Sequence, residues 1–260
     1  MTAAVSCETS FSRASLALTK RWLWRLRREP MGIIAALIQP AIWLILFGNL
    51  FQNGVAGAEG NYIAFMTAGV VVMTVFNGSM SGGVEILFDR ESKMFERLVA
   101  APIPPLAVMT SRFGFVLGLT AIQSTIIFLV SAALGVETAS GIGGYLLIVL
   151  TGMLLGVGIL GLSTALAFGL SNHGPFFAIS SFISLPLIFA SNALAPIENM
   201  PGWLQTVARL NPMSYAISNV RELMLEGYNW PVLGTTVAVL LAFDAVMLTI
   251  CLWTMRRALS

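Results

Sequence analysis

The stretch GGYLLIVLTGMLLGVGILGLSTALAFGL, residues 143–170, contains no charged side chain and points at once to a class of fold. A helix needs about 20 predominantly apolar residues to cross the roughly 30 Å hydrocarbon core of a bilayer. Five further stretches meet this requirement, and they are Met31–Phe51, Tyr62–Val84, Pro105–Leu134, Pro175–Leu194 and Pro231–Trp253. We therefore predict an all-α integral membrane protein with six transmembrane helices, folded as a single domain over residues 1–260.

The composition of the whole chain agrees with a membrane protein. Of its 260 residues, 57% are hydrophobic and only 10% are charged, whereas charged residues make up about 25% of an ordinary soluble domain. The formal net charge is only +2, so the positions of the basic residues are more informative than their sum. We expect them to face the anionic inner leaflet of the membrane and not a nucleic acid.

The basic residues also indicate how the chain is oriented. If the six stretches cross the membrane in alternating directions, 12 of the 14 Lys and Arg residues fall on one face, and only Arg209 and Arg221 fall on the other. Cytoplasmic loops carry an excess of basic residues. We therefore predict a multi-pass protein of the inner (plasma) membrane with both termini in the cytoplasm. Arg112, early in the third stretch, is expected to reach the interface.

Two segments on the cytoplasmic side have amphipathic patterns. Residues 1–30 mix apolar side chains with six cations, which predicts a helix lying in the inner membrane interface; a solvated basic tail is the alternative. We predict that Ser79–Gly83 breaks the second transmembrane helix. Residues 85–100 then predict a separate charged helix, which ends before three closely spaced prolines.

The segment 195–229 is too polar to cross the membrane and too regular to be a plain loop. It predicts two short helices, Pro201–Leu210 and Met213–Glu226, which cap the outer surface or dip back into it as re-entrant helices. Gly227 is a suitable residue for the end of the second helix. The apolar stripe of that helix consists of Met213, Ile217, Val220 and Met224.

Small residues recur at helical spacing in two of the stretches, where they allow helices to approach closely. We expect both sets to pack inside one subunit. The fourth stretch contains Gly152, Gly156, Gly161, Ala165 and Gly169, and the third contains Gly114 and Gly118.

The sequence lacks the motifs of a nucleotide hydrolase or a metalloenzyme. A phosphate-binding loop requires Gly-Lys-Ser/Thr after a glycine-rich turn, and neither Lys20 nor Lys93 follows a glycine. The single histidine, His173, excludes paired-histidine metal motifs, and we interpret it as a turn residue and not as a ligand. We therefore predict no catalytic residue, no metal site and no cofactor in this chain.

One acidic residue lies within a predicted transmembrane helix. Asp244 is near the middle of the last stretch, where a charge is costly and usually has a partner. It is either the proton or cation site of an ion-coupled carrier, or a carboxyl that hydrogen-bonds to another helix at Gln123 or Ser124. We favour the second interpretation, because a lone acid without a nearby His or Lys is a poor proton relay.

Six side chains at helical spacing are candidates for lining an apolar substrate path, although residues in such patterns more often simply pack in a core. They are Met66, Met73, Phe76 and Asn77 of the second stretch and Phe182 and Phe189 of the fifth.

The order of these elements resembles the permease subunits of type-2 ABC exporters, especially the daunorubicin-resistance-like branch. Residues 87–102, LFDRESKMFERLVAAP, look like the coupling-helix region of that family. Residues 200–216, MPGWLQTVARLNPMSYA, followed by Arg221, are similar to the segment before its last span. The resemblance covers nearly the whole chain, but neither motif identifies a substrate, since the family exports drugs, lipids, glycolipids and polysaccharides.

The resemblance implies a permease subunit that moves a lipophilic drug, lipid or glycolipid outward. ATP and Mg would be bound by separate ATP-binding subunits, and a second permease subunit, identical or related, would complete the path. An ATPase can drive export only through a contact that both proteins share. The cytoplasmic helix is the candidate for this contact, although it could also be a membrane-surface helix with a solvated face. A non-transporting membrane scaffold is a further alternative. The predicted coupling residues are Phe88, Asp89, Arg90, Glu91, Phe95, Glu96 and Arg97.

Overall fold

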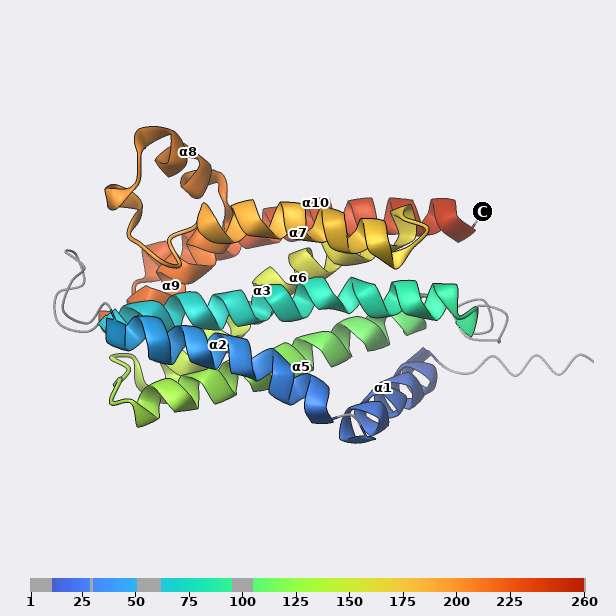
Figure 1. Cartoon of the computed structure of the whole chain (residues 1–260), viewed down its shortest axis with the longest axis horizontal. Coiled ribbons are helices and arrows are strands. Elements are labelled where there is room, and N and C mark those ends of the chain that lie inside the picture. Colours follow the sequence, from blue (N-terminus) through green and yellow to red (C-terminus); the bar gives the residue numbers. More distant parts are fainter. Residues whose placement is uncertain (1–10, 29, 51–61, 95–104, 260) are drawn as a thin grey trace, which may run out of the picture.

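The computed structural model describes residues 11–28, 30–50, 62–94 and 105–259. Within these ranges every regular element is helical, as predicted. The long helices run side by side in a bundle, and α1 (Phe11–Arg28) lies at an angle to them (Figure 1). α1 and the C-terminal end of the chain lie at one end of the bundle (Figure 1). The short helices α8 (Gly202–Leu210) and α9 (Pro212–Leu225) lie at the other.

The predicted apolar stretches fall in six helices, which are α2 (Pro30–Leu50), α3 (Tyr62–Glu91), α5 (Pro105–Ala133), α6 (Gly141–Gly169), α7 (His173–Phe189) and α10 (Trp230–Leu259). Among the residues that the structure describes, α3, α5, α6 and α10 are long and apolar enough to cross a membrane. The other apolar helical segments, Leu37–Leu46 within α2 and the 17-residue α7, are shorter. The all-helical class is confirmed, and length and composition support four of the six predicted crossings.

The helix that contains the second stretch is longer than predicted. The expected break at Ser79–Gly83 is wrong, because α3 continues without interruption to Glu91. Gly83 lies against α6, where its backbone N–H donates to Ser163 Oγ at 3.1 Å. Small residues favour such close helix contacts, which offset the low helix propensity of glycine. Residues 85–91, predicted to begin a separate helix, are therefore the last turns of α3.

The bundle is organised around α6, which packs against α3, α5, α9 and α10. Three of its predicted glycines, Gly152, Gly156 and Gly161, face these neighbours, whereas a Cβ added at Gly169 meets no described residue within 4 Å. A Cβ added at Gly152 or Gly156 would meet Val75 of α3, and one at Gly161 would meet Met247 of α10. These positions allow α6 to lie close to two long helices at once.

The glycine pair of α5 does not pack within the chain. Among the described residues, a Cβ added at Gly114 or Gly118 would meet nothing within 4 Å, so the predicted internal contact is not found there for this pair. Gly114 is exposed, as is Ile122 farther along the same helix. The pair therefore lies on a face of α5 that its neighbours in the chain leave uncovered.

The outer segment contains the two predicted helices, α8 and α9, and a short 3₁₀ turn at Ile197–Asn199 precedes them. Asn211 separates the two, and its Oδ1 caps α9 by accepting the Met213 N–H at 3.0 Å. Gly227 follows α9 with a φ of 104°, a conformation that glycine adopts without strain. The predicted apolar stripe is buried at all four positions, Met213, Ile217, Val220 and Met224.

α7 is attached to the rest of the chain mainly near its ends. Of its residues only Phe176 and Ser180 are buried. At its far end, Asn211 Nδ2 donates to the carbonyl oxygens of Leu187 and Ala190 at 2.7 and 3.0 Å. Such bonds satisfy carbonyls that lack partners at a helix C-terminus.

The predicted continuation of the fifth stretch to Leu194 is therefore wrong. α7 ends at Phe189, and residues 190–194 form turns and bends. The amide of Asn211 fixes this end of α7 by binding carbonyls that a longer helix would have used. The chain then turns toward α8 at the end of the bundle.

Candidate functional site

The first predicted coupling residues lie at the last turns of α3. Phe88 is 46% exposed, and Asp89 is partly buried. Beyond Glu91 the chain turns, with Lys93 at a φ of 57°. The remaining predicted coupling residues lie outside the described residues, and these are Phe95, Glu96 and Arg97. The predicted contact of this segment with an ATPase stays a prediction.

Arg90 contacts the end of α6. Its Nη1 donates to the carbonyl oxygens of Ala167 at 2.5 Å and Leu170 at 3.3 Å. Its guanidinium carbon lies 5.6 Å from the ring centroid of Phe168. The last carbonyls of a helix have no partner within it, and a cation there also faces the negative end of the helix dipole. Arg90 therefore caps α6.

Glu91 contacts the start of α7. Its Oε1 accepts the backbone N–H of His173 at 3.0 Å and lies 3.0 Å from His173 Nδ1, while Oε2 lies 3.2 Å from the same ring nitrogen. The ring centroids of Phe88 and His173 are 5.9 Å apart. The interpretation of His173 as a turn residue is therefore wrong, because it is the first residue of α7 and binds α3.

The six candidate path residues do not come together within one chain. Met66 and Phe76 are fully buried in the main hydrophobic core, and Met73 packs against that core. The other three are exposed on α3 and α7, and these are Asn77, Phe182 and Phe189. Only these three can meet a molecule at the surface of a single chain, so the predicted path itself stays untested.

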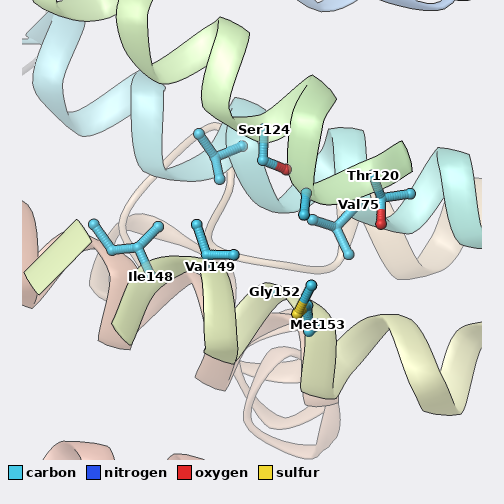
Figure 2. A pocket seen from close by; sticks show the side chains of 9 residues that line it. Val75, Thr120, Ser124, Ile148, Val149, Gly152 and Met153 are labelled. Carbon is cyan, nitrogen blue, oxygen red and sulfur yellow. The ribbon is translucent and has the colours of Figure 1, made fainter. Parts of the chain in front are cut away.

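A small pocket lies between α3, α5 and α6 (Figure 2). Val75 of α3, Thr120 and Ser124 of α5, and Gly152 of α6 are among the residues that line it. Its interior holds about one water molecule. This pocket is therefore too small for an organic cargo, and any path for such a molecule runs elsewhere.

A buried ion pair was missed by the sequence reasoning. The side chain of Arg112 is only 3% exposed, and its Nη2 lies 2.5 Å from Oε2 of Glu85, whose side chain is 42% exposed. The same nitrogen donates to the Gly82 carbonyl oxygen at 3.3 Å. Arg112 therefore lies in the contact between α3 and α5, and its expected position at the membrane interface stays a prediction. The opposite charges of Glu85 and Arg112, near adjoining ends of consecutive helices, were the available signal.

Asp244 is buried against α6. Its side chain is 5% exposed, and a Cβ added at Gly158 would overlap with its carboxyl group. The partners expected from the sequence lie elsewhere, since Gln123 is close to Gly78 and Ser124 lines the pocket of Figure 2. The reason is that α10 packs mainly on α6 and α9. Among the described residues, no cluster of metal-binding side chains includes Asp244.

Residues 13–225 match the family described as ABC-2 type transporter. The chain is 37% identical over 209 residues to the putative transport permease ycf38 of Porphyra purpurea, a match that covers 79% of this chain and 72% of the relative. It is 29% identical over 215 residues to the daunorubicin resistance ABC transporter permease protein DrrB1 of Streptomyces coeruleorubidus, covering 81% and 76%. It is 28% identical over 251 residues to the inner membrane transport permease YadH of Escherichia coli strain K12, covering 91% and 93%.

Proposed function

Because this chain belongs to the ABC-2 type transporter family of membrane transport permeases, we propose that it is the membrane-spanning subunit of an ATP-driven exporter. The match over residues 13–225 carries this proposal. Permeases of this type generally work with ATP-binding subunits. ATP and Mg²⁺ are bound by that separate subunit, in agreement with a sequence in which no lysine follows a glycine.

The proposed cargo is a lipophilic drug, lipid or glycolipid. The similarity to a permease named for daunorubicin resistance supports this class. Asn77, Phe182 and Phe189 are exposed on α3 and α7 and combine one amide with two aromatic rings, which suits a molecule with polar and apolar parts. We place the path along the surface of the chain, where these three side chains are exposed.

A second permease subunit, identical or related, would close this path. α7 is the surface on which we expect it to pack, because little of this helix is buried within its own chain. Phe182 is 79% exposed and Leu185 is 55% exposed. Most closed oligomers are symmetric, so two copies related by a two-fold axis would each present α7 to the path.

The proposed topology has six crossings of the plasma membrane and both termini in the cytoplasm. In this orientation α1 lies in the inner interface, with Trp24 exposed at headgroup depth and Arg28 near it. Arg256 and Arg257 end α10 on the same side. α8 and α9, at the opposite end of the bundle, would cap the outer surface (Figure 1).

The segment that follows Phe88 is the proposed contact with the ATP-binding subunit. The exposed ring of Phe88 can enter a groove on the ATPase, where Asp89 and the residues at 95–97 can set the register by charge pairs. Phe88 and Asp89 belong to the last turns of α3, so a contact of the ATPase with these two residues acts directly on a long helix.

The purified chain alone is expected to have no ATPase activity and to gain it only with an ATP-binding subunit of the same organism. The two proteins should co-purify from membranes, and the complex should hydrolyse ATP in the presence of Mg²⁺. A complex in which the ATP-binding subunit carries a substituted Walker A lysine is the control, and it should be inactive. Hydrolysis by the permease alone, or failure of every ATP-binding subunit of the organism to bind it, would overturn the proposed function.

Cysteine labelling should show that residue 55 is accessible from outside the cell and that residue 173 is accessible only from the cytoplasm. With Cys7 and Cys251 replaced by serine, Val55→Cys should react with an impermeant maleimide added outside intact cells. His173→Cys should react only after the cells are opened, because the positive-inside rule places the start of α7 in the cytoplasm. The cysteine-free parent is the control for background labelling. The reverse pattern of reactivity would contradict the proposed topology.

A further inference from the structure

We infer that Arg90, Glu91 and His173 form a rigid link by which the end of α3 moves α6 and α7 together. We call these three residues the double cap, because two consecutive residues of α3 cap the end of one helix and the start of the next. The inference rests on the proposed function and extends it, since it states how a movement at the coupling segment reaches the path. In this role the three are positioning residues.

The first half of the double cap holds the C-terminus of α6. Arg90 donates to the Ala167 carbonyl oxygen at 2.5 Å and to the Leu170 carbonyl oxygen at 3.3 Å. Both acceptors lie at the C-terminal end of α6, where backbone carbonyls have no hydrogen-bond partner within the helix. The two bonds come from one planar guanidinium, which fixes direction as well as distance. α6 therefore cannot shift along its axis without moving the end of α3.

The second half holds the N-terminus of α7, which has few other means of capping. Asn172 occupies the N-cap position, but its side chain makes no capping hydrogen bond, and Pro175 has no N–H to donate. Glu91 supplies the missing acceptor for the His173 N–H at 3.0 Å. A carboxylate at this position also faces the positive end of the helix dipole.

An exposed Glu–His pair on its own would be a weak contact, because solvent screens it. Here the pair is one part of a larger arrangement. Glu91 binds a backbone N–H as well as the imidazole, the ring of Phe88 lies beside that of His173, and the adjacent Arg90 is fixed to α6. Together these contacts tie the end of α3 to both sides of the turn between α6 and α7.

The middle of α7 makes few contacts that could replace this link. Only Phe176 and Ser180 of α7 are buried, and the next polar attachment is the amide of Asn211 at the far end of the helix. A displacement of the coupling segment therefore reaches the start of α7 through Glu91 and His173, next to the buried cluster that Phe176 shares with Ile86 and Leu87 of α3. α7 also carries Phe182 and Phe189, two of the proposed path residues. A movement of α7 would therefore act directly on the proposed path.

The test measures whether nucleotide binding at the ATPase still changes the surroundings of α7. The reporter is a bimane dye attached to Ser181→Cys, an exposed position in the middle of α7, with Cys7 and Cys251 replaced by serine. Complexes of the permease and its ATP-binding subunit are placed in vesicles of Escherichia coli lipid. Bimane fluorescence is recorded with and without ATP and Mg²⁺, and co-purification of the ATP-binding subunit is measured for every variant.

In the parent complex we expect ATP to change the bimane signal. Glu91→Ala should reduce that change about fivefold, the factor that corresponds to loss of a typical helix cap, while the ATP-binding subunit still co-purifies. His173→Ala should have a smaller effect, since the backbone N–H remains. Glu91→Gln, which keeps a hydrogen-bond acceptor, should restore most of the response. Ser92→Ala is the matched control, because its hydroxyl bonds only to the Asp89 carbonyl within the same turn, and its response should equal that of the parent.

An unchanged response in Glu91→Ala, with the protein inserted at normal abundance, would overturn the double cap. Loss of the ATP-binding subunit from Glu91→Ala would overturn it as well, because Glu91 would then be a docking residue. A parent complex that forms but gives no response to ATP would overturn the proposed ATP-driven function, and the inference with it. If Glu91→Ala is too unstable to purify, the bimane responses of Glu91→Gln and His173→Ala are compared instead. A weaker response in Glu91→Gln than in His173→Ala would contradict the double cap.

Discussion

Replacing Gly83 by leucine is expected to remove nearly all folded protein from the membrane. A Cβ at this position would overlap with the main chain of Ser163 on α6, and a backbone cannot move aside as the end of a side chain can. The substitution would also disturb the hydrogen bond from the Gly83 N–H to Ser163 Oγ. We expect a destabilisation above about 4 kcal/mol, a size reached only when packing is disrupted in the core. Membrane abundance and size-exclusion chromatography of a fluorescent fusion provide the measurement.

Gly118→Leu is the matched control for this substitution. Both glycines lie within long apolar helices, but a Cβ at Gly118 would meet nothing within 4 Å. Its abundance and elution profile should therefore resemble those of the unsubstituted chain. If Gly83→Leu gave a normal monodisperse protein, the close contact between α3 and α6 would be wrong.

Removing the charge of Glu85 is expected to cost more stability than removing the charge of Arg112. Glu85→Leu removes the carboxylate that lies 2.5 Å from the guanidinium of Arg112, which is 3% exposed, and we expect a cost of about 3 kcal/mol, the lower end of the range for buried pairs, because Glu85 is partly exposed. Arg112→Met leaves a carboxylate that is 42% exposed and can still be hydrated. Thermal unfolding in detergent of the two single variants and the double variant would measure the difference.

The double variant adds a second check on the same pair. Glu85→Leu combined with Arg112→Met should be more stable than Glu85→Leu alone, because no buried charge remains without its partner. A greater loss of stability in Arg112→Met than in Glu85→Leu would contradict this account. Additive costs in the double variant would show that the two side chains do not interact.

The sequence predicted those features that depend on local requirements. An apolar run of about 20 residues is such a requirement, and the predicted Pro105–Leu134 agrees closely with α5, Pro105–Ala133. The prediction of a break at Ser79–Gly83 was wrong because the outcome depends on a contact between residues far apart in the sequence. Whether a glycine interrupts a helix depends on what lies against it, and the partner of Gly83 is Ser163, 80 residues away. No short stretch of the sequence contains both residues, so local patterns could not predict their contact.

The same distinction applies to the candidate site. The resemblance to a coupling helix drew attention to Arg90 and Glu91, but their partners in the structure lie 77 and 82 residues farther along the chain. The acceptors of Arg90 are backbone carbonyls, which give no signal in a sequence. Asp244 is a similar case, since the residue beside it is Gly158, which has no side chain to suggest a partner.

The attachment of α7 at its two ends has a consequence for how cargo range can evolve. Phe182 and Leu185 are 79% and 55% exposed, so substitutions there leave the contacts within the chain intact. Glu91 and Asn211 have no such freedom, because their side chains hold the two ends of the helix. Under the proposed function, single substitutions in the middle of α7 would change the surface offered to the cargo without disturbing the contacts that hold this helix to its own chain.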